Sequence, residues 1–192
     1  MIARCLVPVL ILAGLAAFAP AGEDAWTLFE WEEGGCAVLL PGQPVAMRGK
    51  TPEGAIHVRA VPRGERAYLV GYREILALKY HDTDTRDCLF EEEIEAVQGE
   101  LGGALLSQRR VQLGEHLGVE FAIEIPGVGV YRSRLFAVGQ RLYQVTVLGP
   151  VEVVESEQSQ AFLDSFQLRQ TRFCGSPPSG LDMAWCGTSA RE

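Results

Sequence analysis

Residues 104–148 have the sequence ALLSQRRVQLGEHLGVEFAIEIPGVGVYRSRLFAVGQRLYQVTVL, in which four pleated segments are separated by glycine or proline. A period of two is typical of strands that are buried on one side. We therefore predict strands at Ala104–Leu113, Leu117–Ile125, Val130–Val138 and Arg141–Leu148. The connections carry Gly114, Pro126-Gly127 and Gly139-Gln140. They are short enough for hairpins, which indicates an antiparallel sheet.

The flanking segments add further strands and two helices. Short runs broken by glycine and proline predict strands at Trp26–Trp31, Cys36–Leu40, Ala55–Val61 and Ala67–Tyr72. Apolar residues with helical spacing predict a helix over Asp82–Leu101, and a second helix is predicted over Val154–Phe166. The expected fold class is α+β, with one antiparallel β-sheet of about six to seven strands and helices packed on it.

Composition limits the classes of partner. The chain has 192 residues and a formal net charge of −8. Its only lysines, Lys50 and Lys79, are far apart, and Arg109-Arg110 is its longest basic run. Nucleic acids and anionic membrane surfaces require clustered Lys and Arg, so the composition argues against both as partners.

The first 22 residues have the features of a secretory signal peptide. Arg4 supplies a positive charge, Leu6–Phe18 is apolar, and small residues follow at Ala19 and Ala21. The apolar run is shorter than the roughly 20 residues of a membrane span, although an uncleaved anchor stays open. We predict a signal peptide at 1–22, a single domain at 23–168 and a cysteine-containing tail at 169–192. The protein is then exported, periplasmic or extracellular, with no membrane span after cleavage.

Export would place the cysteines in an oxidising compartment, where they are expected to form disulfides. Four remain after residue 22, and an even number in an oxidising compartment predicts two disulfides with three open connectivities. A turn at 177–180 favours Cys174 with Cys186, which leaves Cys36 to pair with Cys88. No two of them have the two-residue separation typical of zinc sites, and free thiols remain the second alternative.

Five segments carry a family pattern: Cys36–Pro44 (CAVLLPGQP), Tyr68–Tyr72 (YLVGY), Gly118–Phe121 (GVEF), Tyr131–Val145 (YRSRLFAVGQRLYQV) and Phe162–Phe166 (FLDSF). Together they resemble the PsbP-like domains of bacterial exported proteins, over most of residues 26–168. The resemblance implies an antiparallel sheet sandwiched by helices, used for binding or assembly and without a shared enzymatic activity. It does not extend to the tail after Leu168.

Metal binding is disfavoured. Asp82–Glu93 has carboxylates at spacings similar to those of a calcium loop. However, Arg86 stands where an oxygen ligand belongs, and Asp87 stands where glycine must make the turn. Acidic residues at a helix start explain the same residues, so we predict no metal site and no cofactor.

The histidines give no clear catalytic pattern. His57, His81 and His116 are far apart, although His57 or His116 beside a carboxylate could act as a base. We predict no catalytic residue and a non-enzymatic binding or assembly domain, with a protein or cell-envelope component as its partner. The alternative is an exported hydrolase with a dispersed histidine and carboxylate site.

Arg132 and Arg134 are the candidate ligand-binding residues. They share one face of a predicted strand, where arginines from a neighbouring strand could complete a site for an anionic ligand. The alternative is an ordinary set of cross-strand ion pairs with Glu120, Glu124 or Glu152.

Overall fold

A computed structural model describes residues 25–51, 54–75 and 83–169. The predicted signal peptide, His81, Asp82, Cys174 and Cys186 lie outside these ranges. The predictions that concern them therefore stay predictions.

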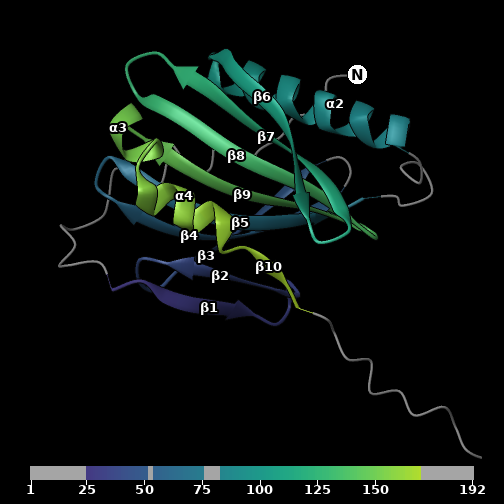
Figure 1. Cartoon of the computed structure of the whole chain (residues 1–192), viewed down its shortest axis with the longest axis horizontal. Helices are drawn as coiled ribbons and strands as arrows, with labels where there is room; N and C mark the ends of the chain where they lie inside the picture. The colour runs from purple at the N-terminus through teal and green to yellow at the C-terminus, as the bar shows by residue number, and fades with distance from the viewer. Residues whose placement is uncertain (1–24, 52–53, 76–82, 170–192) are drawn as a thin grey trace, which may run out of the picture.

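The described residues form two antiparallel sheets and three helices (Figure 1). The larger sheet has the order β3-β4-β5-β9-β8-β7-β6. Its strands are β3 (Val45–Thr51), β4 (Gly54–Arg63), β5 (Arg66–Glu74), β6 (Ala104–Leu113), β7 (His116–Ile125), β8 (Gly129–Val138) and β9 (Arg141–Gly149). The smaller sheet, in the order β1-β2-β10, contains β1 (Thr27–Trp31), β2 (Cys36–Leu40) and β10 (Gln167–Leu168). The helices are α2 (Thr83–Leu101), α3 (Val151–Val154) and α4 (Glu157–Asp164).

The predicted fold class, a single sheet with packed helices, is wrong. Most of the described residues lie in strands, and these strands form two sheets of seven and three. The β1–β2 hairpin does not join the large sheet, because β2 pairs with β1 on one edge and with β10 on the other. Strand β3 was also not predicted. It is an edge strand with the sequence VAMRGKT, in which Met47 packs against the core but Gly49 has no side chain at the next half-buried position, so its alternation is weak.

The second helix, predicted over Val154–Phe166, is shorter in the structure, where α4 spans Glu157–Asp164 and the unpredicted short helix α3 precedes it. Glu155 is the C-cap of α3, and Ser156 is the N-cap of α4, where its side chain accepts a hydrogen bond from the backbone N–H of Ser159. Ser is a favoured N-cap because its oxygen satisfies an N–H that the helix leaves unpaired.

Helix α2 covers one face of the large sheet, called here the α2 face. Its apolar residues, including Phe90, Ile94 and Val97, are buried with sheet residues such as Phe121 and Leu135. Each large apolar side chain that is fully buried contributes about 1.5–3 kcal/mol. These contacts explain why the spacing seen in the sequence forms this helix.

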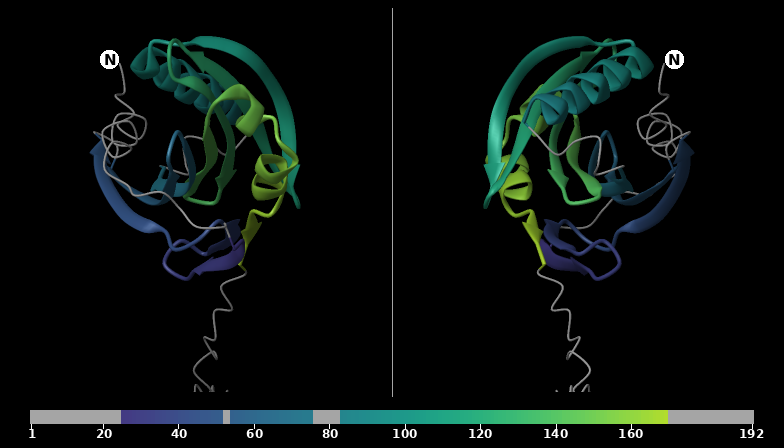
Figure 2. Two further views of the ribbon diagram at one scale, coloured as in Figure 1. Left: turned by 90° about the vertical axis from the view of Figure 1, so that its left-hand side faces the viewer. Right: turned by 90° about the vertical axis from the view of Figure 1, so that its right-hand side faces the viewer.

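The opposite face, called here the α4 face, is covered by α3, α4 and the small sheet. Val38 and Leu40 of β2 and Phe162 of α4 are all buried with large-sheet residues such as Tyr68 and Val145. The large sheet is curved, and its two edge strands, β3 and β6, lie on opposite sides of the molecule (Figure 2).

Candidate functional site

Glu120 on β7 is a buried carboxylate surrounded by arginines from both neighbouring strands. Arg109 on β6 and Arg132 on β8 each donate two hydrogen bonds to Glu120 Oε1, at 3.1 Å from Nε and 2.8 Å from Nη2. Arg134 Nε donates to Oε2 at 2.6 Å. The register explains the cluster, because Glu120 lies directly opposite Arg109 on one side and Arg134 on the other. Directly opposite residues project from the same face and lie close together.

The same arginines attach helix α4 to the sheet. Arg132 Nη2 donates to Gln160 Oε1 at 2.7 Å. Arg134 Nη1 donates to the carbonyl of Leu163 at 3.0 Å, and its Nη2 pairs with Asp164 at 2.8 Å. A cation at the C-terminal end of a helix also interacts favourably with the helix dipole. The cluster therefore links three strands to α4.

Charge pairing dominates the ionisation of Glu120. Burial alone would raise the pKa of this carboxyl, but hydrogen bonds from Arg134, Arg132 and Arg109 outweigh it and lower the pKa to about 2. Hydrogen bonds from cations favour the charged form of a carboxyl. Glu120 is therefore ionised throughout the physiological pH range.

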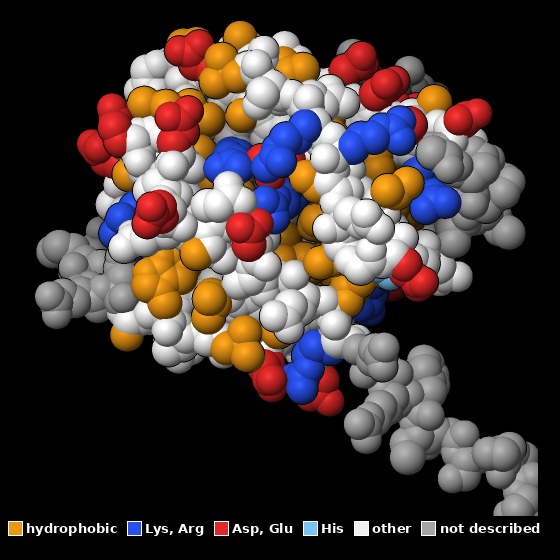
Figure 3. Space-filling model, in the orientation of Figure 1, with side chains coloured by type: hydrophobic (Ala, Val, Ile, Leu, Met, Phe, Trp, Pro, Cys, Tyr) orange, Lys and Arg blue, Asp and Glu red, His pale blue; other side chains and the backbone are white. Residues whose placement is uncertain are grey.

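The structure thus places the predicted ligand-binding residues in an ion-pair network that includes Glu120. The side chains of Arg132 and Arg134 are 17% and 11% exposed, whereas that of Arg109 is 59% exposed. The network, with Asp164 as its second carboxylate, has three guanidinium groups and two carboxylates, which leaves one positive charge in excess. Figure 3 shows basic side chains gathered over β6 and β8 with acidic atoms between them. Gln160 and Asp164 were missed from the sequence, since no local pattern links them to β8.

His57 lies in a separate cluster on β4. Its ring stacks on that of Tyr72 at 4.8 Å, and its Nδ1 lies 3.6 Å from Glu33 Oε1. Among the described residues, no hydroxyl or thiol donates a hydrogen bond to Nδ1 or accepts one from it. His116 Nε2 lies 4.0 Å from the carboxylate of its exposed neighbour Glu115. In the described part of the chain, a histidine and a carboxylate therefore lie close together at His57, and Nδ1 makes no hydrogen bond to a nucleophile.

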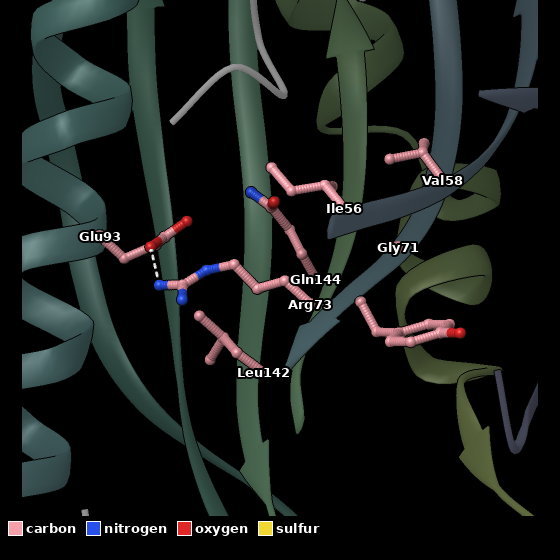
Figure 4. A pocket seen from close by; sticks show the side chains of 8 residues that line it. Ile56, Val58, Gly71, Arg73, Glu93, Leu142 and Gln144 are labelled. Atoms are coloured by element: carbon pink, nitrogen blue, oxygen red, sulfur yellow. Dashed lines mark hydrogen bonds and ion pairs between the residues drawn. The ribbon is translucent and has the colours of Figure 1, made fainter. Parts of the chain in front are cut away.

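A small cavity lies between the large sheet and α2, lined by Ile56, Val58, Gly71, Tyr72, Arg73, Glu93, Leu142 and Gln144 (Figure 4). Arg73 of β5 points toward α2 and pairs with the buried Glu93 at 2.7 Å. The cavity holds about 20 Å³. That volume accommodates about one water molecule.

The predicted crosslink between Cys36 and Cys88 is not formed. Within the described part of the chain both thiols are unpaired, with Cys36 buried and Cys88 exposed. Cys36 lies in β2 on the α4 face, whereas Cys88 lies in α2 on the other side of the large sheet. Burial raises the pKa of the Cys36 thiol to about 12, which makes it unreactive.

The described residues also bear on metal and membrane binding. No group of three or more His, Cys, Asp or Glu side chains among them could hold a metal ion. The part of the calcium-like segment that the structure describes is the start of α2. None of the described helices is both long and apolar enough to cross a bilayer.

The open edge of the large sheet at β6 is its most exposed strand surface. Among the described strands β6 pairs only with β7, and every residue from Ala104 to Arg110 is exposed. Leu105 and Leu106 are 40% and 54% exposed. The register with β7 shifts between Leu105 and Ser107, which places a bulge at Leu106 and leaves Ser107–Leu113 regular. An edge strand presents backbone N–H and C=O groups that can pair with another chain.

Two solved structures resemble this arrangement. Cyanobacterial PsbP (CyanoP) from Synechocystis sp. PCC 6803 aligns with a TM-score of 0.56 and 11% sequence identity, over 80% of this chain and 98% of that one. The fold is PsbP-like. A protein of unknown function from Pseudomonas aeruginosa, described as a putative regulator, aligns with a TM-score of 0.41 and 11% identity, over 72% and 91% of the two chains.

At 11% identity the likeness to PsbP concerns the fold alone. No family model matches the chain, and no curated protein matches its sequence. The resemblance to PsbP-like domains in the sequence is therefore confirmed for the fold, and its further implications need separate support.

Proposed function

We propose that this chain is an exported, non-enzymatic domain for binding or assembly, with a protein or cell-envelope component as its partner. The observation that carries the proposal is strand β6, a ten-residue edge strand that is exposed from Ala104 to Arg110. Such an edge can bind an extended segment through main-chain hydrogen bonds. The signal-like features of residues 1–22 support export.

Strand β6 is a better binding surface than the opposite edge. On β3, Arg48 lies 3.7 Å from Glu33 of the β1–β2 turn, so the small sheet is close to that edge. On β6, Arg109 is the exposed member of the Glu120 cluster, so its side chain is accessible at this edge. The site for a partner is therefore proposed at β6.

A position-specific crosslinking experiment tests the binding role. A photocrosslinking amino acid is placed at Gln108 of β6 or, as a matched control, at Ala46 of β3; both positions are exposed on edge strands. We expect ultraviolet light in the producing cells to give a discrete adduct from Gln108 and none from Ala46. Equal adducts from both positions, or none from either, would argue against a partner at β6.

Cleavage of the signal peptide and the disulfide in the tail are tested separately. N-terminal sequencing of the exported protein is expected to find a chain that starts close to Glu23, and a retained Met1 would contradict cleavage of the segment and favour an uncleaved anchor. We also propose that Cys174 and Cys186 form a disulfide in the tail. Peptide mapping without reduction is expected to detect that crosslink, and alkylation of both thiols would contradict it.

A further inference from the structure

Two adjacent arginines occupy the regular part of β6 and project from opposite faces of the sheet. Arg109 binds Glu120 on the α4 face, and Arg110 binds Asp87 of α2 on the other face. Their side chains are similarly exposed, at 59% and 66%. A segment that pairs with β6 would therefore pass beside both guanidinium groups.

The two arginines differ in how their charge is balanced. Arg110 has a carboxylate partner in Asp87. Arg109 shares Glu120 with Arg132 and Arg134, in a network that carries one excess positive charge. The most exposed arginine of this network is Arg109, which lies on the open edge strand and projects from the α4 face.

Pairing of β6 with a second copy of itself is unfavourable. A symmetric antiparallel pair places one residue directly opposite its own copy, and opposite residues project from the same face. Registers centred on Arg109 or Arg110 therefore oppose two like charges, which destabilises the pair. A register centred on a residue after Arg110 pairs fewer residues of Ser107–Leu113. A register centred on a residue before Arg109 extends the pairing into the bulge at Leu106.

We propose that the β6 edge binds an extended protein segment that pairs antiparallel with Ser107–Leu113 and places an acidic side chain opposite Arg109. This inference rests on the proposed function and names the chemistry of the partner. Cross-strand pairs of opposite charge stabilise a sheet, and main-chain hydrogen bonds supply binding that is independent of sequence. The overall charge of −8 does not prevent this, because exposed charges beyond about 8 Å are largely screened at physiological salt.

Peptide binding to the full chain tests the proposal. The probe is a fluorescein-labelled peptide in which Glu alternates with Val, long enough to cover Ser107–Leu113, and the control peptide has Lys in place of Glu. We expect saturable binding of the acidic peptide by fluorescence anisotropy, weakened by added salt. Hydrogen exchange is expected to show new protection at Ser107–Leu113 in the complex, which a charge contact without strand pairing would not produce.

Adjacent variants provide the matched control. Arg109→Gln is expected to weaken the acidic peptide up to about fivefold, which corresponds to the loss of one cross-strand charge pair. Arg110→Gln is expected to change the affinity much less, because Arg110 is already balanced by Asp87. Glu120 keeps two arginine partners in Arg109→Gln, so the fold should persist and far-ultraviolet circular dichroism can verify it.

Three results would overturn the proposal. The first is binding without protection of β6, and the second is an equal loss of affinity in Arg109→Gln and Arg110→Gln. The third is dimerisation of the chain through β6, detected as adducts between two copies from Gln108. If Gln108 captures another protein but the acidic peptide does not bind, the charge inference fails while the binding role stands. If neither experiment detects a partner, both fail.

Discussion

Removing the charge of Glu120 should destabilise the protein in a way that depends on pH. Glu120 is 5% exposed and holds three arginines from two strands. In Glu120→Gln the side chain keeps nearly the same shape but can no longer balance the guanidinium groups. Breaking a buried ion pair by removing one partner is strongly destabilising, because the remaining charges are left uncompensated.

The pKa of Glu120 sets the size and the pH range of the effect. A fall from the ordinary 4.5 to about 2 in the folded protein corresponds to about 3 kcal/mol at pH 7. Since the folded pKa is the lower one, this stability is fully present above 4.5 and is lost as the pH falls toward 2. About 1 kcal/mol of it should remain at pH 3. Arg109 is 59% exposed, so solvent screens part of the effect and we expect a loss of about 2–3 kcal/mol at pH 7.

Urea unfolding measures this loss, with fluorescence of the buried Trp31 as the signal. The difference between the wild type and Glu120→Gln is expected to shrink between pH 7 and pH 3. Glu124→Gln is the matched control, since Glu124 is exposed on the same strand and should change the free energy of unfolding by less than about 0.5 kcal/mol. A loss below about 1 kcal/mol at pH 7, or a difference that does not vary with pH, would refute the reasoning.

Three other predictions concern packing and thiol reactivity. Iodoacetamide is expected to alkylate Cys88 in the folded protein and Cys36 only after unfolding, because burial raises the pKa of Cys36 to about 12. Equal labelling of the two cysteines in peptide mass spectra of the folded protein would contradict this. Gly118→Ala should cost about 1–3 kcal/mol, because the added Cβ would collide with the backbone of β8, and an unchanged melting temperature would count against it. Tyr143→Phe removes the 2.9 Å hydrogen bond to the carbonyl of Gly34 and should cost about 1 kcal/mol in urea unfolding; no loss would mean that the β1–β2 turn is held by other contacts.

Much of the local structure could be predicted, because alternation and turn residues are local signals. The segment that begins at Ala104 forms four consecutive hairpin-linked strands, and Cys36–Leu40 has the predicted bounds. The helix at Thr83–Leu101 followed from the spacing of its apolar residues. Val45–Thr51 was not found in this way, because Gly49 follows Met47 on its half-buried side and weakens the signal.

The candidate site was only half predictable. Arg132 and Arg134 stood out because residues two apart share a face of a strand. That they bind one carboxylate depends on the register of β7 with β6 and β8, where a shift by one residue would move Glu120 to the α2 face. The contact of Arg134 with Asp164 spans thirty positions and depends on where α4 docks.

Local sequence patterns are sufficient to predict most of the strands and the main helix, because each of these elements depends on residues that are near one another in the chain. Which cysteines lie apart, which arginines share a carboxylate and which strand lies at an edge follow from the folded arrangement of the whole domain. These properties depend on pairing between distant segments, and many pairings are compatible with the same local pattern. Burial then selects the one arrangement that covers both faces of the large sheet, and it leaves β6 open.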